Sequence, residues 1–226
     1  MTALGRPRLH HREIDSTNRR ARELASAGAP HGTLVTATAQ SAGRGRQGRV
    51  WSAPPGSALL MSVVLRDPPA LLPLCAAVAV AEVCGEDARI KWPNDVLVDG
   101  LKVAGILAEG RPQEGWAVLG IGVNVAVDPA DLPPELRDRA ATLGRPRGAL
   151  EPALDELLRA LAARLDQPAR DCLAALRARD ALRDRRVRWA GGAGTGAGID
   201  DGGALLVRRP DGTLAALAAG EVHLEG

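Results

Sequence analysis

The strongest constraint on the fold is a glycine- and arginine-rich segment, GRGRQGR at residues 43–49, which is followed by VWSAPPGS. Its glycines match the G-x-G-x-x-G spacing of dinucleotide-binding folds, in which the loop opens directly into a helix whose N-terminus holds a pyrophosphate. The sequence after Gly48 contains two consecutive prolines and cannot begin a helix there. The segment therefore excludes a dinucleotide-binding unit and indicates a loop between two strands.

Apolar patterning predicts an α+β fold for the larger part of the chain. Short apolar or alternating runs predict strands at residues 33–40, 57–65, 89–92 and 116–127, and a hairpin at 96–110 that turns at Asp99-Gly100. Helical spacing predicts helices at residues 18–27, 71–84, 150–165 and 169–182, the first of them capped by the residues 15–17 and ended by Gly28. We therefore expect a mixed or antiparallel sheet with flanking helices.

The composition changes at Arg185, after which short strand candidates alternate with Gly, Asp-Gly-Gly and Pro-Asp-Gly turns. Such spacing is typical of a small SH3-like β-barrel. We place a domain boundary at residue 184, which gives a larger domain at 1–183 and a C-terminal domain at 184–226. Within the latter, the glycine run at 191–198 is expected to be a loop.

Charge and cysteine content exclude several classes of protein. The net charge of the 226 residues is +2, so no basic surface field indicates a nucleic-acid partner. Three cysteines without a C-x-x-C pair indicate neither a disulfide framework nor a zinc site. The most apolar stretch, residues 70–81, is interrupted by Pro73 and is shorter than the roughly 20 residues that a membrane span needs. With no signal-peptide pattern at the N-terminus, we expect a cytoplasmic protein.

The rarest polar residues fall in the same few segments. Of the 29 Lys and Arg residues only Lys91 and Lys102 are lysine, and the only asparagines are Asn18, Asn94 and Asn124. Glycines let a backbone fold closely around a ligand, and the guanidinium forks of an arginine loop bind carboxylate and phosphate. A compact lysine ammonium suits a position between two oxyanions, and a tryptophan beside the loop offers a stacking surface. We therefore expect an anion-binding site.

Each segment also has a purely structural interpretation that the residues alone leave open. The arginine loop can be a solvated surface loop, and DST at 15–17 a helix N-cap. Lys102 can be a solvent-facing hairpin residue, and GIGVN at 120–124 a strand with close backbone packing.

Taken in order, the segments resemble the motif set of the biotin protein ligases: DSTN at 15–18, Gln40, GRGRQGRVW at 43–51, KWPND at 91–95, GLKVAGIL at 100–107 and GIGVN at 120–124. The resemblance implies a class II synthetase-like catalytic domain followed by the SH3-like domain. It also implies an enzyme that joins biotin to ATP, forms biotinyl-5′-AMP and transfers biotin to a lysine of a carrier domain. Because about a dozen residues precede Asp15, we expect the monofunctional form without an N-terminal DNA-binding domain.

The resemblance also implies roles for individual residues. Its biotin-binding set is Ser16, Thr17, Asn18, Gln40, Gly43, Arg44, Lys102 and Gly105. Its ATP-binding set is Arg46, Arg49, Trp51, Asn94, Asp95, Lys102 and Asn124. In the catalytic set, Arg44 and Lys102 bridge the biotin carboxylate and the α-phosphate, and Asp95 orients the acceptor amine. Mg²⁺ is expected to bind through the phosphates, with Asp95 as the nearest candidate ligand.

The implied partner is the biotin carboxyl carrier domain of a biotin-dependent carboxylase, with no DNA or membrane partner, and both a monomer and a homodimer remain open. A lipoate–protein ligase is the nearest alternative, and a nucleic-acid-binding module built on the arginine loop is a remote one. Glu225 stands where some relatives have a basic residue that reaches the nucleotide, so Arg208 or Arg209 is a candidate substitute. Lys91 has no assigned chemical step.

Overall fold

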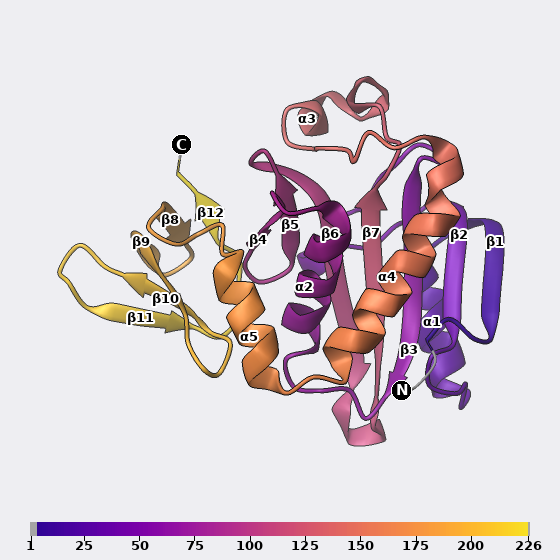
Figure 1. Ribbon diagram of the computed structural model, residues 1–226, viewed down its shortest axis with the longest axis horizontal. Coiled ribbons are helices and arrows are strands. Elements are labelled where there is room, and N and C mark those ends of the chain that lie inside the picture. Colours follow the sequence, from indigo (N-terminus) through magenta and orange to yellow (C-terminus); the bar gives the residue numbers. More distant parts are fainter. Residues whose placement is uncertain (1–3, 226) are drawn as a thin grey trace.

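The main body of the protein is a seven-stranded mixed sheet with helices on both faces (Figure 1). The computed structural model describes residues 4–225. The strands lie in the order β1-β2-β3-β7-β6-β5-β4, with bounds β1 Arg8–Ile14, β2 Leu34–Gln40, β3 Ala58–Arg66, β4 Arg89–Lys91, β5 Asp95–Val98, β6 Leu101–Arg111 and β7 Trp116–Asn124. Strands β1 and β2 are parallel, whereas all other neighbours are antiparallel. The predicted fold class is confirmed.

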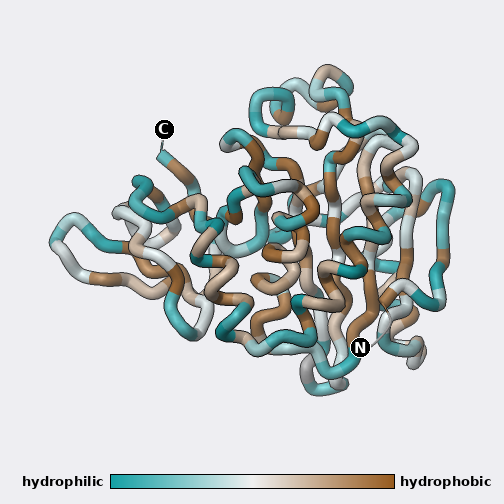
Figure 2. Tube along the Cα trace, viewed as in Figure 1, coloured by the Kyte–Doolittle hydropathy of each residue, from teal (hydrophilic) through white to brown (hydrophobic). Residues whose placement is uncertain are grey.

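The alternation of side chains along β3 and β7 separates two cores. Met61, Val63 and Leu65 join the large core under α2 (Leu72–Cys84), α4 (Leu150–Leu165) and α5 (Ala169–Ala178). Val64 and Val118 pack with the alanines of α1 (Thr17–Ser26). Because neighbouring residues of a strand point to opposite faces, α1 covers the face opposite to α2 and α4. Figure 2 shows the apolar colouring concentrated in the central strands, with mixed colouring along the helices.

Helix α1 begins where its cap was predicted. Ser16 has extended backbone angles and its side chain accepts a hydrogen bond from the Arg19 N–H, which satisfies one of the free donors of the first turn. Gly28 follows the helix with a φ of +87°, as expected for a residue that ends a helix in the left-handed region. At the predicted hairpin turn, Asp99 and Gly100 both have positive φ, as a type I′ turn requires.

Three features differ from the sequence predictions. Strand β1 was not predicted, because as an edge strand with mostly exposed side chains it lacks an apolar face. Helix α5 ends at Ala178 rather than at residue 182, since Arg179 and Ala181 form backbone hydrogen bonds with Ile90 at the end of the sheet. The glycine run expected to be a loop is strand β9 (Gly192–Ile199), paired on both sides.

The C-terminal residues form a second, antiparallel sheet in the order β11-β10-β9-β8-β12, consistent with an SH3-like domain. Its other strands are β8 Arg186–Trp189, β10 Leu205–Arg208, β11 Leu214–Leu217 and β12 His223–Leu224. Val187, Leu205 and Val207 join the large core of the main sheet, and the Trp92 indole N–H donates to the Gly203 carbonyl at 3.0 Å. The two sheets therefore pack together, while the domain boundary at 184 stays a prediction. Among the described residues, no helix has the length and apolarity needed to cross a membrane.

Candidate functional site

A cavity of about 900 Å³ opens on the sheet face that carries α1. Its floor is formed by three glycines of β6 and β7, Gly105, Gly120 and Gly122, whose missing side chains leave room for groups above the sheet. Thirteen of the fourteen predicted site residues line it: Ser16, Thr17, Asn18, Gln40, Arg44, Arg46, Arg49, Trp51, Asn94, Asp95, Lys102, Gly105 and Asn124. Gly43 is the exception: its carbonyl accepts the Trp51 N–H at 3.0 Å and so closes the arginine loop.

One end of the cavity is a preorganised polar cluster on α1, β2 and β3. The Gln40 Oε1 accepts hydrogen bonds from the Thr17 N–H at 2.7 Å and from the Thr17 hydroxyl at 3.0 Å. The buried Ser62 hydroxyl lies 2.9 Å from Thr17 Oγ1 and 2.7 Å from Asn18 Oδ1. Ser62 was not predicted, because one serine in the apolar run of β3 gives no pattern. Together these groups can recognise a compact ligand that both donates and accepts hydrogen bonds.

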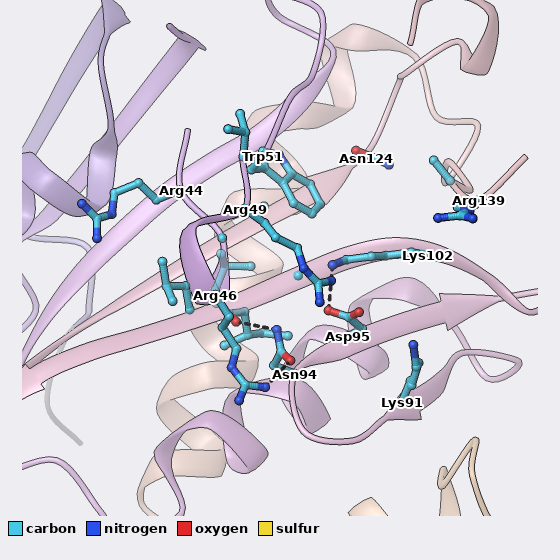
Figure 3. Close-up of a pocket in the computed structure, with 18 of the residues that line it drawn as sticks. Arg44, Arg46, Arg49, Trp51, Lys91, Asn94, Asp95, Lys102, Asn124 and Arg139 are labelled. Atoms are coloured by element: carbon cyan, nitrogen blue, oxygen red, sulfur yellow. Dashed lines mark hydrogen bonds and ion pairs between the residues drawn. The ribbon is translucent and has the colours of Figure 1, made fainter. Parts of the chain in front are cut away.

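Glu109 accepts hydrogen bonds from two of the predicted site residues. It accepts hydrogen bonds from the Asn18 amide at 2.8 Å and from the Arg44 guanidinium at 3.0 Å. Figure 3 shows Arg44 turned away from Lys102, while Arg49 extends toward Lys102 and Asp95 and Arg46 extends toward Asn94. The predicted bridging pair of Arg44 and Lys102 is therefore not assembled in this arrangement.

Lys102 and Asp95 form the centre of the cavity. The Lys102 Nζ lies 2.7 Å from Asp95 Oδ1 and 5.6 Å from the centroid of the Trp51 ring, within the range of a cation–π contact. No described group donates an aligned hydrogen bond to this buried carboxylate oxygen. The Lys102 ammonium is therefore half-buried and paired with a carboxylate that a substrate oxyanion can replace. This suits a lysine that binds a substrate anion.

The arginine loop is held by residues of the β4–β5 turn and of the segment between β11 and β12. Gly45 N–H donates to the Arg49 carbonyl at 2.7 Å, and a 3₁₀ turn spans Arg46–Gly48, so no α-helix follows the glycines, as predicted. The Arg46 guanidinium donates to Asn94 Oδ1 at 2.8 Å and to the Gly220 carbonyl at 3.1 Å. Arg49 forms an ion pair with Glu221. Burial lowers the pKa of Arg46, an effect that the neighbouring Asp95 opposes.

Trp51 lies flat on the glycine floor. A Cβ on Gly122 would fall 2.7 Å from Trp51 Cζ2 and 2.8 Å from its Nε1, so the ring occupies the space that the glycine leaves. The Trp51 Nε1 and the Asn124 Oδ1 are buried and have no hydrogen-bond partner among the described residues. Two unsatisfied polar atoms beside an aromatic ring indicate a binding place for a flat polar group.

An apolar wall above Trp51 comes from a segment that the sequence did not point to. Leu132 and Leu136 line the cavity and belong to an apolar cluster with Leu60 and Trp51. Their segment is tied to the site because Asn124 Nδ2 donates to the Ala141 carbonyl at 2.9 Å. No apolar periodicity marks this stretch, so its position depends on tertiary contacts.

The C-terminal sheet also reaches the cavity, but not through the predicted residues. Arg208 and Arg209 do not line it, whereas Arg188, Glu221 and His223 do. Glu225 lies 3.3 Å from the Arg186 guanidinium and 3.4 Å from that of Arg188. The C-terminal residues therefore contribute both charge and walls to the site.

The carboxylates that line the cavity are Asp95, Asp138 and Glu221. The described residues contain no cluster of three or more His, Cys, Asp or Glu side chains that could form a metal site. This donor set fits a magnesium ion that keeps most of its ligands from phosphates and water and takes one or two carboxylates from the protein. The arrangement is therefore suited to positioning anions and stabilising charge, without an enzyme nucleophile.

Comparisons with known proteins identify the family of this chain. Residues 11–126 match the family model described as the biotin/lipoate A/B protein ligase family. The biotin--[acetyl-CoA-carboxylase] ligase of Paracoccus denitrificans is 38% identical over 245 residues, covering 94% of this chain and 98% of that protein. The bifunctional ligase/repressor BirA of Bacillus subtilis is 43% identical over 157 residues, covering 64% of this chain and 48% of that protein. The chain thus spans about half the length of that relative.

Among solved structures, the chain is similar to the biotin protein ligase from Aquifex aeolicus in complex with biotin and ATP. The TM-score is 0.83 at 27% identity, over 98% of this chain and 99% of that one. A structure of an arginine-to-glycine variant of that ligase in complex with biotin also matches, with a TM-score of 0.81 at 26% identity, over 96% of this chain and 97% of that one.

Proposed function

The chain belongs to the biotin/lipoate A/B protein ligase family, and from this membership we propose that it activates biotin with ATP and transfers it to a lysine of a biotin carboxyl carrier domain. One observation carries the proposal. A single cavity joins a polar cluster at Thr17 and Gln40, the Lys102–Asp95 pair and the ring of Trp51. These three places match the three parts of a biotinyl-adenylate: a ureido ring, an acyl phosphate and an adenine.

In the first step, an oxygen of the biotin carboxylate attacks the α-phosphorus of ATP. The bond from this phosphorus to the bridging oxygen breaks, and pyrophosphate leaves with the electron pair. Ser16, Thr17 and Gln40 hold the ureido ring, and the Lys102 ammonium neutralises the carboxylate and α-phosphate oxygens on either side of the new oxygen–phosphorus bond. Bringing two anions together is the main barrier, so positioning and positive charge supply the rate.

The arginines divide this task according to where they lie. Arg49 extends toward Lys102 and Asp95, and Arg46 donates to the neighbouring Asn94, so both are assigned to the phosphates. Arg44 bridges carboxylate and phosphate only if it leaves Glu109, so we propose that substrate binding exchanges this partner. Trp51 stacks on the adenine, and the unsatisfied Asn124 Oδ1 accepts a hydrogen bond from its amino group.

In the second step, the carrier lysine attacks the acyl carbon of the adenylate. A carbon–nitrogen bond forms, the carbon–oxygen bond to AMP breaks, and the amine gives up a proton. Asp95 orients this amine and accepts its proton once Lys102 has turned to the adenylate phosphate. The carboxylate is suited to this because it lies beside Lys102 with an oxygen to which no described group donates an aligned hydrogen bond.

Magnesium would be bound as the complex of ATP and would neutralise phosphate charge, and Asp95 would be its protein ligand. We place the reaction in the cytoplasm, where ATP and the carrier protein meet, and propose neither a DNA nor a membrane partner. The ligase acts as a monomer or a homodimer.

The test is ATP–pyrophosphate exchange with magnesium, measured with biotin, with lipoate and without either acid. Exchange that depends on biotin, followed by transfer of labelled biotin to a carrier domain, is expected. Exchange with lipoate alone would replace the proposal by lipoate activation. Salt-sensitive binding of random DNA without exchange would replace it by a nucleic-acid-binding function.

A further inference from the structure

Two cations of the cavity have no role in the chemistry described above. Lys91 and Arg139 both line it, yet neither side chain makes a hydrogen bond or ion pair with any residue in 4–225. The remaining Lys and Arg side chains of the lining are all paired: Arg44 with Glu109, Arg46 with Asn94, Arg49 with Glu221, Lys102 with Asp95 and Arg188 with Glu225. The two free cations are therefore available to an anion at no cost in broken ion pairs.

Strand order places Lys91 at a defined side of the reacting centre. Across the sheet, the polar cluster at Gln40 lies on β2, Lys102 on β6, Asp95 on β5 and Lys91 on β4. A ligand that extends from Gln40 to Lys102 therefore points onward to the edge where Lys91 lies. Lys91 and Asp95 are opposite each other in the β4–β5 register, and Figure 3 shows the Lys91 side chain directed toward Asp95.

Arg139 is fixed relative to Lys102 through the backbone. The Lys102 N–H donates to the Arg139 carbonyl at 2.9 Å, and the Ala141 N–H donates to the Lys102 carbonyl at 2.8 Å. In Figure 3 the Arg139 guanidinium lies on the side of Lys102 away from Arg44. An otherwise irregular segment thus places a guanidinium on the side of Lys102 away from Arg44, where Figure 3 also shows Lys91.

In-line displacement at phosphorus requires the attacking and leaving oxygens to lie on opposite sides of the phosphorus atom. If the biotin carboxylate approaches Lys102 from the β2 side, the leaving group departs toward the β4 edge. A pyrophosphate carries several negative charges, and charge-assisted hydrogen bonds from Lys and Arg are the strongest that side chains offer it.

We propose that Lys91 and Arg139 form the site of the leaving pyrophosphate, which is also the site of the β- and γ-phosphates of bound ATP. This assignment rests on the proposed adenylation. It assigns a binding role to Lys91, the lysine of KWPND, and to Arg139, which lies outside the motifs of the sequence analysis. Burial lowers the pKa of Lys91, with Lys102 and Arg49 adding to the effect and Asp95 opposing it, so a bound polyphosphate would stabilise its charged form.

The test compares Lys91→Met, Lys91→Arg and Arg139→Met with the wild-type chain in biotin-dependent ATP–pyrophosphate exchange. Losing one charge-assisted hydrogen bond raises the KM for pyrophosphate by about tenfold or more, and Lys91→Arg recovers part of the loss. The second readout is single-turnover transfer from prepared biotinyl-5′-AMP to a carrier domain, which bypasses pyrophosphate. It stays within about twofold of wild type if the two residues act only on the leaving group.

Arg12→Met is the matched control, because it removes the same charge from an exposed position on β1, at the far edge of the sheet. A KM for pyrophosphate within about twofold of wild type in both methionine variants overturns the assignment, as does a parallel loss in transfer from the adenylate. Arg139 is exposed, so its variant decides the matter even if Lys91→Met does not fold. If the wild-type chain exchanges with lipoate instead of biotin, the proposed substrate fails while the leaving-group site is tested with that acid.

Discussion

Substituting Gly122 by alanine tests whether the ring of Trp51 is the nucleotide-binding surface. An added Cβ would collide with Cε2 of the ring and lie 2.7–2.8 Å from its Cζ2 and Nε1, closer than real Cβ atoms approach a neighbour, and these atoms belong to a rigid indole. Either the strand shifts or the ring leaves the floor. Overpacking costs about 1–3 kcal/mol, whereas a Gly→Ala change at a negative φ returns about 0.4–1 kcal/mol.

We expect the ring to move, because it belongs to a loop, whereas Gly122 is paired on both sides in the centre of the sheet. The unfolding midpoint then falls by only a few degrees, since about 1 kcal/mol corresponds to about 2–4 °C at this chain length. The KM for ATP rises far more, by about fivefold to a hundredfold, which is the range for losing one base–aromatic stacking contact. The KM for biotin stays close to wild type, because the Thr17–Gln40 cluster lies elsewhere in the cavity.

The assay is biotin-dependent ATP–pyrophosphate exchange, with Gly148→Ala as the control, since a Cβ at Gly148 meets nothing within 4 Å. A double-mutant cycle with Trp51→Leu isolates the cause. If the alanine acts through the ring, the combined variant binds ATP no worse than Trp51→Leu alone. Additive losses of ATP affinity in the two variants would refute the argument that the Trp51 ring requires glycine at position 122.

Three further predictions concern other parts of the site. Lys102→Arg is expected to keep the unfolding midpoint but to lower the rate of biotin-dependent ATP–pyrophosphate exchange by about a hundredfold or more. The reason is that a planar guanidinium does not replace the compact ammonium between Asp95 and Trp51. Pyrophosphate release at the wild-type rate would contradict this. Glu221→Gln removes the ion-pair partner of Arg49, so trypsin is expected to cleave the loop at 43–49 up to about fivefold faster. Biotinyl-5′-AMP is expected to slow this cleavage because the loop closes over it. Equal cleavage rates with and without the adenylate would speak against closure of the loop. The pKa of His223 is lowered by burial and by the neighbouring Lys91, Arg49 and Arg188. The contribution of the neutral imidazole to the free energy of unfolding is therefore full above the ordinary histidine pKa and declines as the pH falls below it. Between about pH 7.5 and about pH 5.5, His223→Gln is expected to lose less stability than wild type, and identical losses would refute this.

Local pattern was sufficient for most of the fold, and its failures have physical causes. Helix α2 and strands β3 and β7 are nearly all buried, so their apolar runs determine them. Strand β1 is an exposed edge paired only with β2, and nothing in its own residues requires the pairing. The glycines of β9 suggest a loop, yet Gly194 and Gly196 are needed because a Cβ there would collide with the backbone of Arg208 and of Leu182. Glycine in a strand can reflect close packing with another segment, which a single sequence does not reveal.

The candidate site divides in the same way. Motif residues could be predicted because their chemistry is local: an arginine loop, a rare lysine and a strand with glycines on one face. Leu132, Leu136 and Arg139 could not, since they reach the cavity through tertiary contacts: the hydrogen bonds of residues 139–141 with Lys102 and Asn124, and apolar packing on Leu60 and Trp51. Glu221 reaches it from the segment between β11 and β12, which the sequence placed in a separate domain. The pairing of Arg44 with Glu109 was equally hidden, because the two residues are 65 positions apart.

The pairing of cations with carboxylates across the cavity has a consequence for substrate binding. Glu109, Asp95 and Glu221 each hold a cation that the proposed chemistry needs, so a single weak anion must compete with a carboxylate already in place. Partly exposed ion pairs of this kind contribute about 1 kcal/mol or less each, so the competition is mild for a ligand of several charges. ATP can displace these partners together, whereas an isolated carboxylate cannot displace more than one. The arrangement therefore favours binding of a polyphosphate, and it leaves each released carboxylate beside the site, where Asp95 is positioned to receive the acceptor amine.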